Sequence, residues 1–130
     1  MMVGLALLMS VTAGSAHFGE SRLESFSNVC WSEDGGDLLG TTLWILPAVD
    51  GTRLLIQRYE GGPLTPALLS TRVEDGKLVV YSDRSEPLYA VRRDGKGVRI
   101  RYLDGEQGSD GGNEERLPPV VTVGEFPDCK

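Results

Sequence analysis

Two cysteines, Cys30 and Cys129, are the residues whose chemistry this sequence predicts most directly. In an exported chain such a pair forms one disulfide, whereas in a reducing compartment it stays as two free thiols. The bond closes a loop of about 100 residues, for which chain-entropy estimates give about 4–5 kcal/mol of stabilisation. It also requires Cα atoms within about 7 Å of each other. We therefore predict a Cys30–Cys129 disulfide that brings the two ends of the domain together.

His17 is the only histidine, and it lies near the N-terminus. A side chain in a flexible terminus cannot be held in a catalytic geometry, so Ser-His-Asp and Cys-His mechanisms are not expected. One imidazole and two bonded sulfurs do not fill a zinc or haem site either. We expect no catalytic residue, no metal site and no cofactor, and hence not an enzyme; copper chelation by His17, as a bare N-terminal residue, is the alternative.

Carboxylates are the other groups that could do chemistry. The acidic segment 104–115 places oxygen ligands at alternate positions, as calcium requires, but Gly108 stands where an EF-hand has a ligand. The segment is otherwise a solvated loop. Glycoside hydrolysis needs two carboxyl groups that face each other across a cleft, and nothing in the sequence singles out such a pair. A carboxylate-dependent hydrolase is therefore kept as an alternative function.

Positive charge gathers in one short stretch of this acidic chain, whose formal net charge is −6. Within ten residues lie Arg92, Arg93, Arg99 and Arg101, together with one lysine, and only Asp94 opposes them. Arg99 and Arg101 fall on one strand face, where their guanidinium groups can bind a carboxylate or a phosphate. The alternative is a solvent-facing strand whose arginines pair with nearby acids. This stretch is the best candidate for partner recognition.

A second candidate for binding is the face shared by Arg53, Leu55, Gln57 and Tyr59. Arg53 and Tyr59 can line a ligand cavity there. More often, such a row is the solvent face of a strand.

The first sixteen residues differ from the rest of the chain and indicate export. An apolar run, 3–9, is followed by small residues that end at Ala16, which is the pattern of a signal peptide. The run is too short to span a bilayer. We assign 1–16 as signal peptide, 17–24 as a flexible lead and 25–130 as a single β-domain, with a secreted or periplasmic location and no membrane span.

Turn signals recur about every ten residues of the domain, which is typical of a β-meander, barrel or sandwich. Between them we expect about eight strands: 25–32, 38–46, 52–60, 65–73, 77–82, 88–93, 98–103 and 119–126. Segment 64–70 is as compatible with a helical turn. Several strands are apolar on both faces, so both faces of the sheet must be covered. The predicted fold is a small all-β antiparallel barrel or meander closed by one disulfide.

The layout resembles small exported eight-stranded barrels, among them the periplasmic inhibitors of C-type lysozyme. In that family a cysteine on the first strand bonds one near the C-terminus, as Cys30 and Cys129 would here. The family's Ser-Gly inhibitory loop and its Tyr and Lys motif are absent. Cys30-Trp31 followed by 40–44 (GTTLW) is also similar to lipocalin-like barrels, which carry an early Gly-x-Trp. Both resemblances concern architecture and assign no site residues.

The function predicted from these features is an exported, non-catalytic binding module. Its ligand is a small apolar or anionic molecule, or a protein partner such as an envelope component or a hydrolase to be inhibited. Nucleic acid is not expected, because neutralising phosphates needs a surplus of basic residues. The chain is expected to be monomeric. The alternatives are the carboxylate-dependent hydrolase and a structural component of an envelope assembly.

Overall fold

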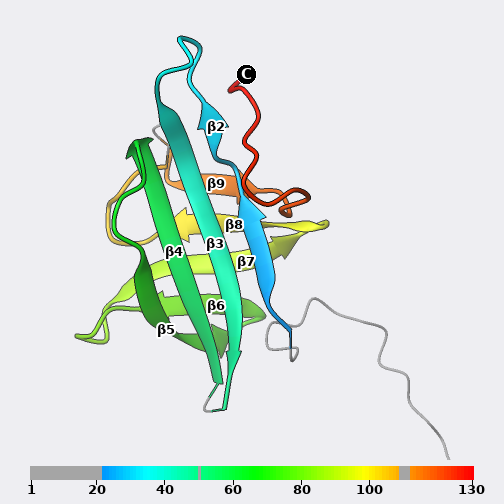
Figure 1. The fold of residues 1–130 in the computed structure, drawn as a ribbon. Helices are drawn as coiled ribbons and strands as arrows, with labels where there is room; N and C mark the ends of the chain where they lie inside the picture. The colour runs from blue at the N-terminus through cyan, green and yellow to red at the C-terminus, as the bar shows by residue number, and fades with distance from the viewer. Residues whose placement is uncertain (1–21, 50, 109–111) are drawn as a thin grey trace, which may run out of the picture.

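The computed structural model describes residues 22–49, 51–108 and 112–130, which form an antiparallel, nearly closed barrel (Figure 1). The strands are β1 Glu24–Ser27, β2 Cys30–Trp31, β3 Leu38–Ala48, β4 Gly51–Gly61, β5 Ala67–Glu74, β6 Lys77–Tyr81, β7 Pro87–Asp94, β8 Gly97–Tyr102 and β9 Glu114–Leu117. Their order around the barrel is β1-β3-β4-β5-β6-β7-β8-β9, and β2 pairs with β3 beyond the end of β1. The predicted all-β barrel is confirmed.

Two hairpins, β3–β4 and β7–β8, place apolar residues of neighbouring strands opposite each other. The long β3–β4 ladder pairs Leu43 with Ile56, and β7–β8 pairs Val91 with Ile100. All four of these side chains are buried. The second half of segment 64–70 belongs to a strand, because β5 begins at Ala67. The alternative of a helical turn was therefore wrong. Within the described ranges, no helix has the length and apolar character that a bilayer crossing needs.

The last predicted strand, 119–126, was wrong. The final strand is β9, Glu114–Leu117, whose first two residues belong to the segment 104–115 that was expected to be a loop. Pro118 and Pro119 follow it directly and cannot donate backbone hydrogen bonds to a ladder, so regular pairing stops there. The first predicted strand, 25–32, is divided into β1 and β2, because the Asn28 side chain accepts a hydrogen bond from the Thr41 backbone between them (2.7 Å).

The C-terminal segment, 118–130, completes the barrel along β1 and β2. The Ser27 amide donates to the Pro118 carbonyl (2.9 Å), and the Val120 amide donates to the Ser25 carbonyl (3.0 Å). Farther along, the Cys129 amide donates to the Trp31 carbonyl (2.7 Å). The predicted disulfide joins Cys30 to Cys129, with their Cα atoms 4.9 Å apart. This bond indicates an oxidising, extracytoplasmic compartment.

Aliphatic and aromatic side chains fill the middle of the barrel. They come from every strand of the barrel path except β5, whose Leu69 packs against them from a partly buried position. The core residues are Phe26, Leu43, Ile45, Leu54, Ile56, Leu78, Val80, Tyr89, Val91, Val98, Ile100, Tyr102 and Leu117. A filled interior leaves the ends and the outer surface of the barrel for ligand contacts.

An ion pair between Glu24 and Arg93 closes one end of the barrel. The two guanidinium NH groups donate to the two carboxylate oxygens at 2.6 and 2.5 Å, and the guanidinium also lies 5.9 Å from the centre of the Phe26 ring. Arg93 alternates in step with the buried Tyr89 and Val91, so it points toward the barrel axis. The hydrogen bonds from Arg93 lower the pKa of Glu24.

The predicted signal peptide, most of the predicted lead and His17 lie outside the described residues. Of the lead, Glu24 belongs to β1.

Removing the disulfide should cost more stability than any surface substitution. We expect the Cys30→Ala/Cys129→Ala variant to lose about 4–5 kcal/mol of unfolding free energy, because the bond joins residues 99 apart in sequence. Urea unfolding of the oxidised protein and of the variant measures this difference. A loss below about 1 kcal/mol would show that the bond does not constrain the unfolded chain.

Glu24→Gln should lower stability by about 1–2 kcal/mol at pH 7, because a charge-assisted pair is lost. A lowered folded-state pKa means that the pair stabilises the fold fully above the ordinary value of 4.5, and that this stability disappears as pH falls through the folded-state pKa. The variant should therefore show a flatter decline in stability between pH 4.5 and the lower folded-state pKa of Glu24. Denaturant titrations across pH 2–7 test this, with the exposed Glu33→Gln as control; parallel curves for Glu24→Gln and wild type would contradict it.

A candidate binding groove beside the C-terminal segment

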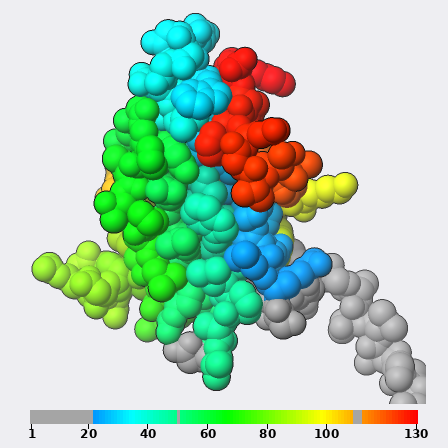
Figure 2. All heavy atoms as spheres, in the orientation of Figure 1, coloured from blue at the N-terminus to red at the C-terminus, as the bar shows by residue number. Residues whose placement is uncertain are grey.

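A groove of about 870 Å³ lies between the C-terminal segment and the outer faces of β1, β3 and β4. In the space-filling view this segment, orange to red, packs beside the first strands (Figure 2). Ser25 and Ser27 from β1, Thr42 and Trp44 from β3, and Tyr59 from β4 form the floor. They face outward because side chains alternate along a strand and Phe26, Leu43 and Ile45 occupy the core.

The outer wall of the groove is the loop from Val120 to Pro127, and backbone hydrogen bonds hold both ends of this loop. Val120 bonds to β1, while the Pro127 carbonyl accepts a hydrogen bond from the Trp31 amide of β2 (2.8 Å). The Cys30–Cys129 disulfide lies next to the Pro127 end of the loop. The Phe126 ring packs against Tyr59 with ring centroids 5.9 Å apart. The loop is therefore held in place without a partner.

The tip of this loop exposes apolar side chains. Val121 is 92% exposed and Val123 is 90% exposed. Both residues also line the rim of the groove. The chain turns at Gly124, whose φ of +83° favours glycine.

Polar groups on the groove floor bond to one another. The hydroxyl groups of Ser27 and Thr42 lie 2.9 Å apart, and the Tyr59 hydroxyl donates to the Gln57 side-chain carbonyl (3.2 Å). Trp44, Tyr59 and Phe126 provide the aromatic surface of the groove. The groove is suited to hold apolar groups, with few polar contacts to orient them.

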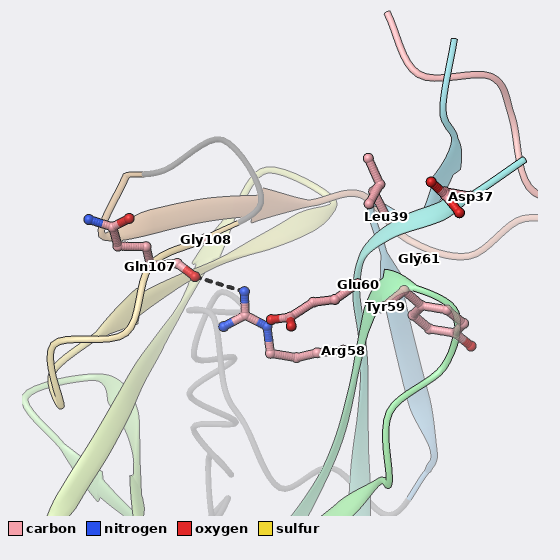
Figure 3. A pocket seen from close by; sticks show the side chains of 8 residues that line it. All are labelled: Asp37, Leu39, Arg58, Tyr59, Glu60, Gly61, Gln107 and Gly108. Atoms are coloured by element: carbon pink, nitrogen blue, oxygen red, sulfur yellow. Dashed lines mark hydrogen bonds between the residues drawn. The ribbon is translucent and has the colours of Figure 1, made fainter. Parts of the chain in front are cut away.

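A smaller hollow, about 410 Å³, lies between the start of β3, the end of β4 and the loop 104–108 (Figure 3). Arg58 points toward the loop 104–108 and donates to the Gln107 carbonyl (2.7 Å), while Tyr59 turns to the other side of β4. Asp37 and Glu60 also line this hollow.

Below Arg58, the carboxylate of Glu115 is buried within the barrel. One of its oxygens accepts hydrogen bonds from the hydroxyls of Thr41 (2.9 Å) and Tyr102 (3.0 Å). The Arg58 guanidinium lies 5.0 Å from the centre of the Tyr102 ring. Burial raises the pKa of Tyr102, and it raises that of Tyr89 to about 12. The Tyr102 hydroxyl is protonated at neutral pH, as that of an ordinary tyrosine is, and it donates to Glu115.

The structure separates the binding residues proposed from the sequence. Tyr59 lines the groove, but Arg53 lies about 20 Å away along β4, where it donates to the Ser70 hydroxyl. Arg93 points inward and pairs with Glu24. Arg92, Arg99 and Arg101 lie on the outer face of β7 and β8, and Arg116 of β9 joins them.

The sequence interpretation missed the groove, Arg58 and Glu115. For Glu115 a signal existed, since it stands two positions before Leu117 and so shares its inward face. No such signal marked the groove, because its wall follows the path of a segment without regular structure.

No family model, no curated protein and no solved structure matches the chain. Among the residues that the structure describes, no group of three or more His, Cys, Asp or Glu side chains is placed to hold a metal ion.

Glu115→Ala should cost about 1–3 kcal/mol, because it leaves two buried hydroxyl donors without their acceptor. Glu115→Gln keeps a carbonyl oxygen at the same place and should cost less. Denaturant unfolding of both variants measures the difference. Equal losses would contradict this expectation, because the acceptor oxygen that Glu115→Gln retains would then contribute nothing.

Proposed function

We propose that the protein is an exported, non-catalytic binding module that receives apolar side chains of a partner protein in the groove beside its C-terminal segment. The observation that carries this proposal is the combination of a concave aromatic floor with a convex apolar rim. Trp44 and Tyr59 lie in the floor, and Val121 and Val123 project from the rim.

The exposure of the two valines favours a protein over a small molecule. A small ligand inside the groove would contact the floor and at most the inner side of each valine, and would leave the outer side of both valine side chains in water. A protein surface can cover the rim and insert side chains into the hollow together, which is how exposed apolar patches on soluble proteins are commonly used. Tryptophan and tyrosine are also the residue types that most often dominate binding energy at such surfaces.

The way the loop 120–127 is held at both ends also supports binding of a protein partner. Ordering a mobile loop on binding costs about 0.5–1.5 kcal/mol for each immobilised side chain. Here the loop is already held by the hydrogen bonds to β1 and β2, by the disulfide and by Phe126 on Tyr59. A partner therefore meets a preorganised surface.

The volume of the groove favours a second candidate, a small apolar ligand. At about 870 Å³ the groove falls within the range of about 300–1,000 Å³ that is usual for ligand pockets. Such a ligand would lie on Trp44 and leave the loop tip free.

Random dodecapeptides displayed on phage, selected on the immobilised oxidised protein, test the proposal. We expect the selected peptides to carry aromatic or branched aliphatic anchors. Their affinity, measured by fluorescence anisotropy with synthetic peptides, should fall about tenfold or more on Trp44→Ala and should also fall on Val121→Ser/Val123→Ser. Leu68→Ala, which alters an exposed leucine of β5 outside the groove, is the matched control and should change it less than about twofold.

Peptides that bind Trp44→Ala as well as the wild type would refute the proposal. Stoichiometric binding of dodecanoate that Trp44→Ala abolishes and Val121→Ser/Val123→Ser leaves intact, with no peptide selected, would establish the small apolar ligand in its place.

A further inference from the structure

Three arginines form a row across the outer face of β7, β8 and β9. Arg92 lies opposite Arg99, and Arg99 lies opposite Arg116, in direct cross-strand register. Their side chains remain 46%, 37% and 45% exposed, respectively. The row spans two strand spacings, about 10 Å.

Like charges in direct cross-strand pairs destabilise a sheet, so the row needs counter-ions. Two carboxylates of the chain supply them. Glu114 lies 3.3 Å from nitrogens of both Arg92 and Arg99, and Asp94 lies 2.7 Å from Arg99 and 3.2 Å from Arg116. The hydrogen bond from Arg99 lowers the pKa of Asp94, which keeps this carboxylate charged.

The counter-ions do not balance the face. Arg101 is exposed on the same side of β8, and it stands opposite Glu114 in the β8–β9 register. Within the described part of the chain Glu114 pairs with Arg92 and Arg99, and Arg101 makes no ion pair. Four arginines therefore face two carboxylates, on a protein whose formal net charge is −6. This local excess of positive charge is the opposite of the charge on the rest of the molecule.

Arg92 and Arg116, at the two ends of the row, have N–H donors that the carboxylates of the row do not occupy. Each guanidinium carries five N–H donors in a planar fork. Arg99 uses two of its nitrogens on Asp94 and Glu114, whereas Arg92 uses one on Glu114 and Arg116 uses one on Asp94. Because carboxylates already bind between the arginines, further carboxylates can bind at the two ends of the row with the same geometry.

We propose that Arg92, Arg99, Arg101 and Arg116 form a docking surface for a short acidic segment of a partner protein. The length of the row decides between partners. Nucleic acids and anionic membranes extend far beyond 10 Å, and their remaining charges would meet the acidic remainder of this chain. A short run of Asp or Glu side chains can end where the arginines end. This surface is independent of the apolar groove, and either can exist without the other.

A fluorescein-labelled peptide of four glutamates, flanked by Gly-Ser, is the direct probe, because four extended residues span about 10 Å. Its affinity for the oxidised protein is measured by anisotropy at about 20 mM and about 150 mM salt, where screening of surface charges differs strongly. Arg92→Gln/Arg116→Gln removes the outer donors and leaves Arg99 to hold both carboxylates. We expect it to weaken binding about tenfold at low salt. Arg72→Gln/Arg84→Gln removes the same charge elsewhere and should weaken binding less than about twofold.

A second variant acts in the opposite direction. Glu114→Gln removes a carboxylate that competes for Arg92 and Arg99, so binding should become several-fold tighter, whereas the exposed Glu74→Gln should change it little. This comparison decides the question if the double arginine variant does not fold. Equal loss in the two arginine variants, or no gain with Glu114→Gln, would overturn the proposal. So would binding of a sulfated oligosaccharide or phosphatidylglycerol vesicles through the row by a protein that ignores the peptide.

Discussion

The attachment of the C-terminal segment to β1 and β2 is the constraint on which this molecule depends. β1 has four residues and β2 has two, so neither offers enough pairing to close a barrel by itself. Backbone hydrogen bonds from 118–120 and 127–129, together with the Cys30–Cys129 bond, complete that edge. The same attachment determines where the loop 120–127 lies, and so it creates the groove. We call this attachment, the backbone hydrogen bonds together with the disulfide, the tether. The tether both closes the barrel and forms the candidate site.

The interior of the barrel is occupied by core side chains, so the surfaces that can bind a partner lie on its outside. Aliphatic and aromatic side chains fill the middle, and charged groups close the two ends. At one end Arg93 pairs with Glu24, and at the other Glu115 is held by Thr41 and Tyr102 below Arg58. Buried charges are tolerated at these places because each has hydrogen-bonding partners. The barrel serves as a rigid support for its surface, where an apolar face and an arginine row lie on different strands.

Local patterns in the sequence predicted the fold well, and failed where tertiary context decides. Turn signals about every ten residues and strands that are apolar on both faces predicted the antiparallel barrel, and the cysteine pair predicted its closure. β9 was missed because it is short, half acidic and follows a loop of similar composition. Arg93 was grouped with the exterior arginines although it alternates in step with Val91, and Arg116 was left out because only the β8–β9 register places it beside Arg99. The groove could not be predicted, since its wall has no periodic structure.

The central claim is that the tether holds the C-terminal segment against β1 and β2 in solution. Amide hydrogen exchange, followed by NMR in the oxidised and the reduced protein, tests this directly. In the oxidised protein the amides of Ser27, Val120, Trp31 and Cys129 should exchange slowly, as their hydrogen bonds require. After reduction, the amides of Trp31 and Cys129 should exchange fast while the β3–β4 ladder stays protected. Free-chain exchange at all four amides in the oxidised protein, with a protected ladder, would contradict the account.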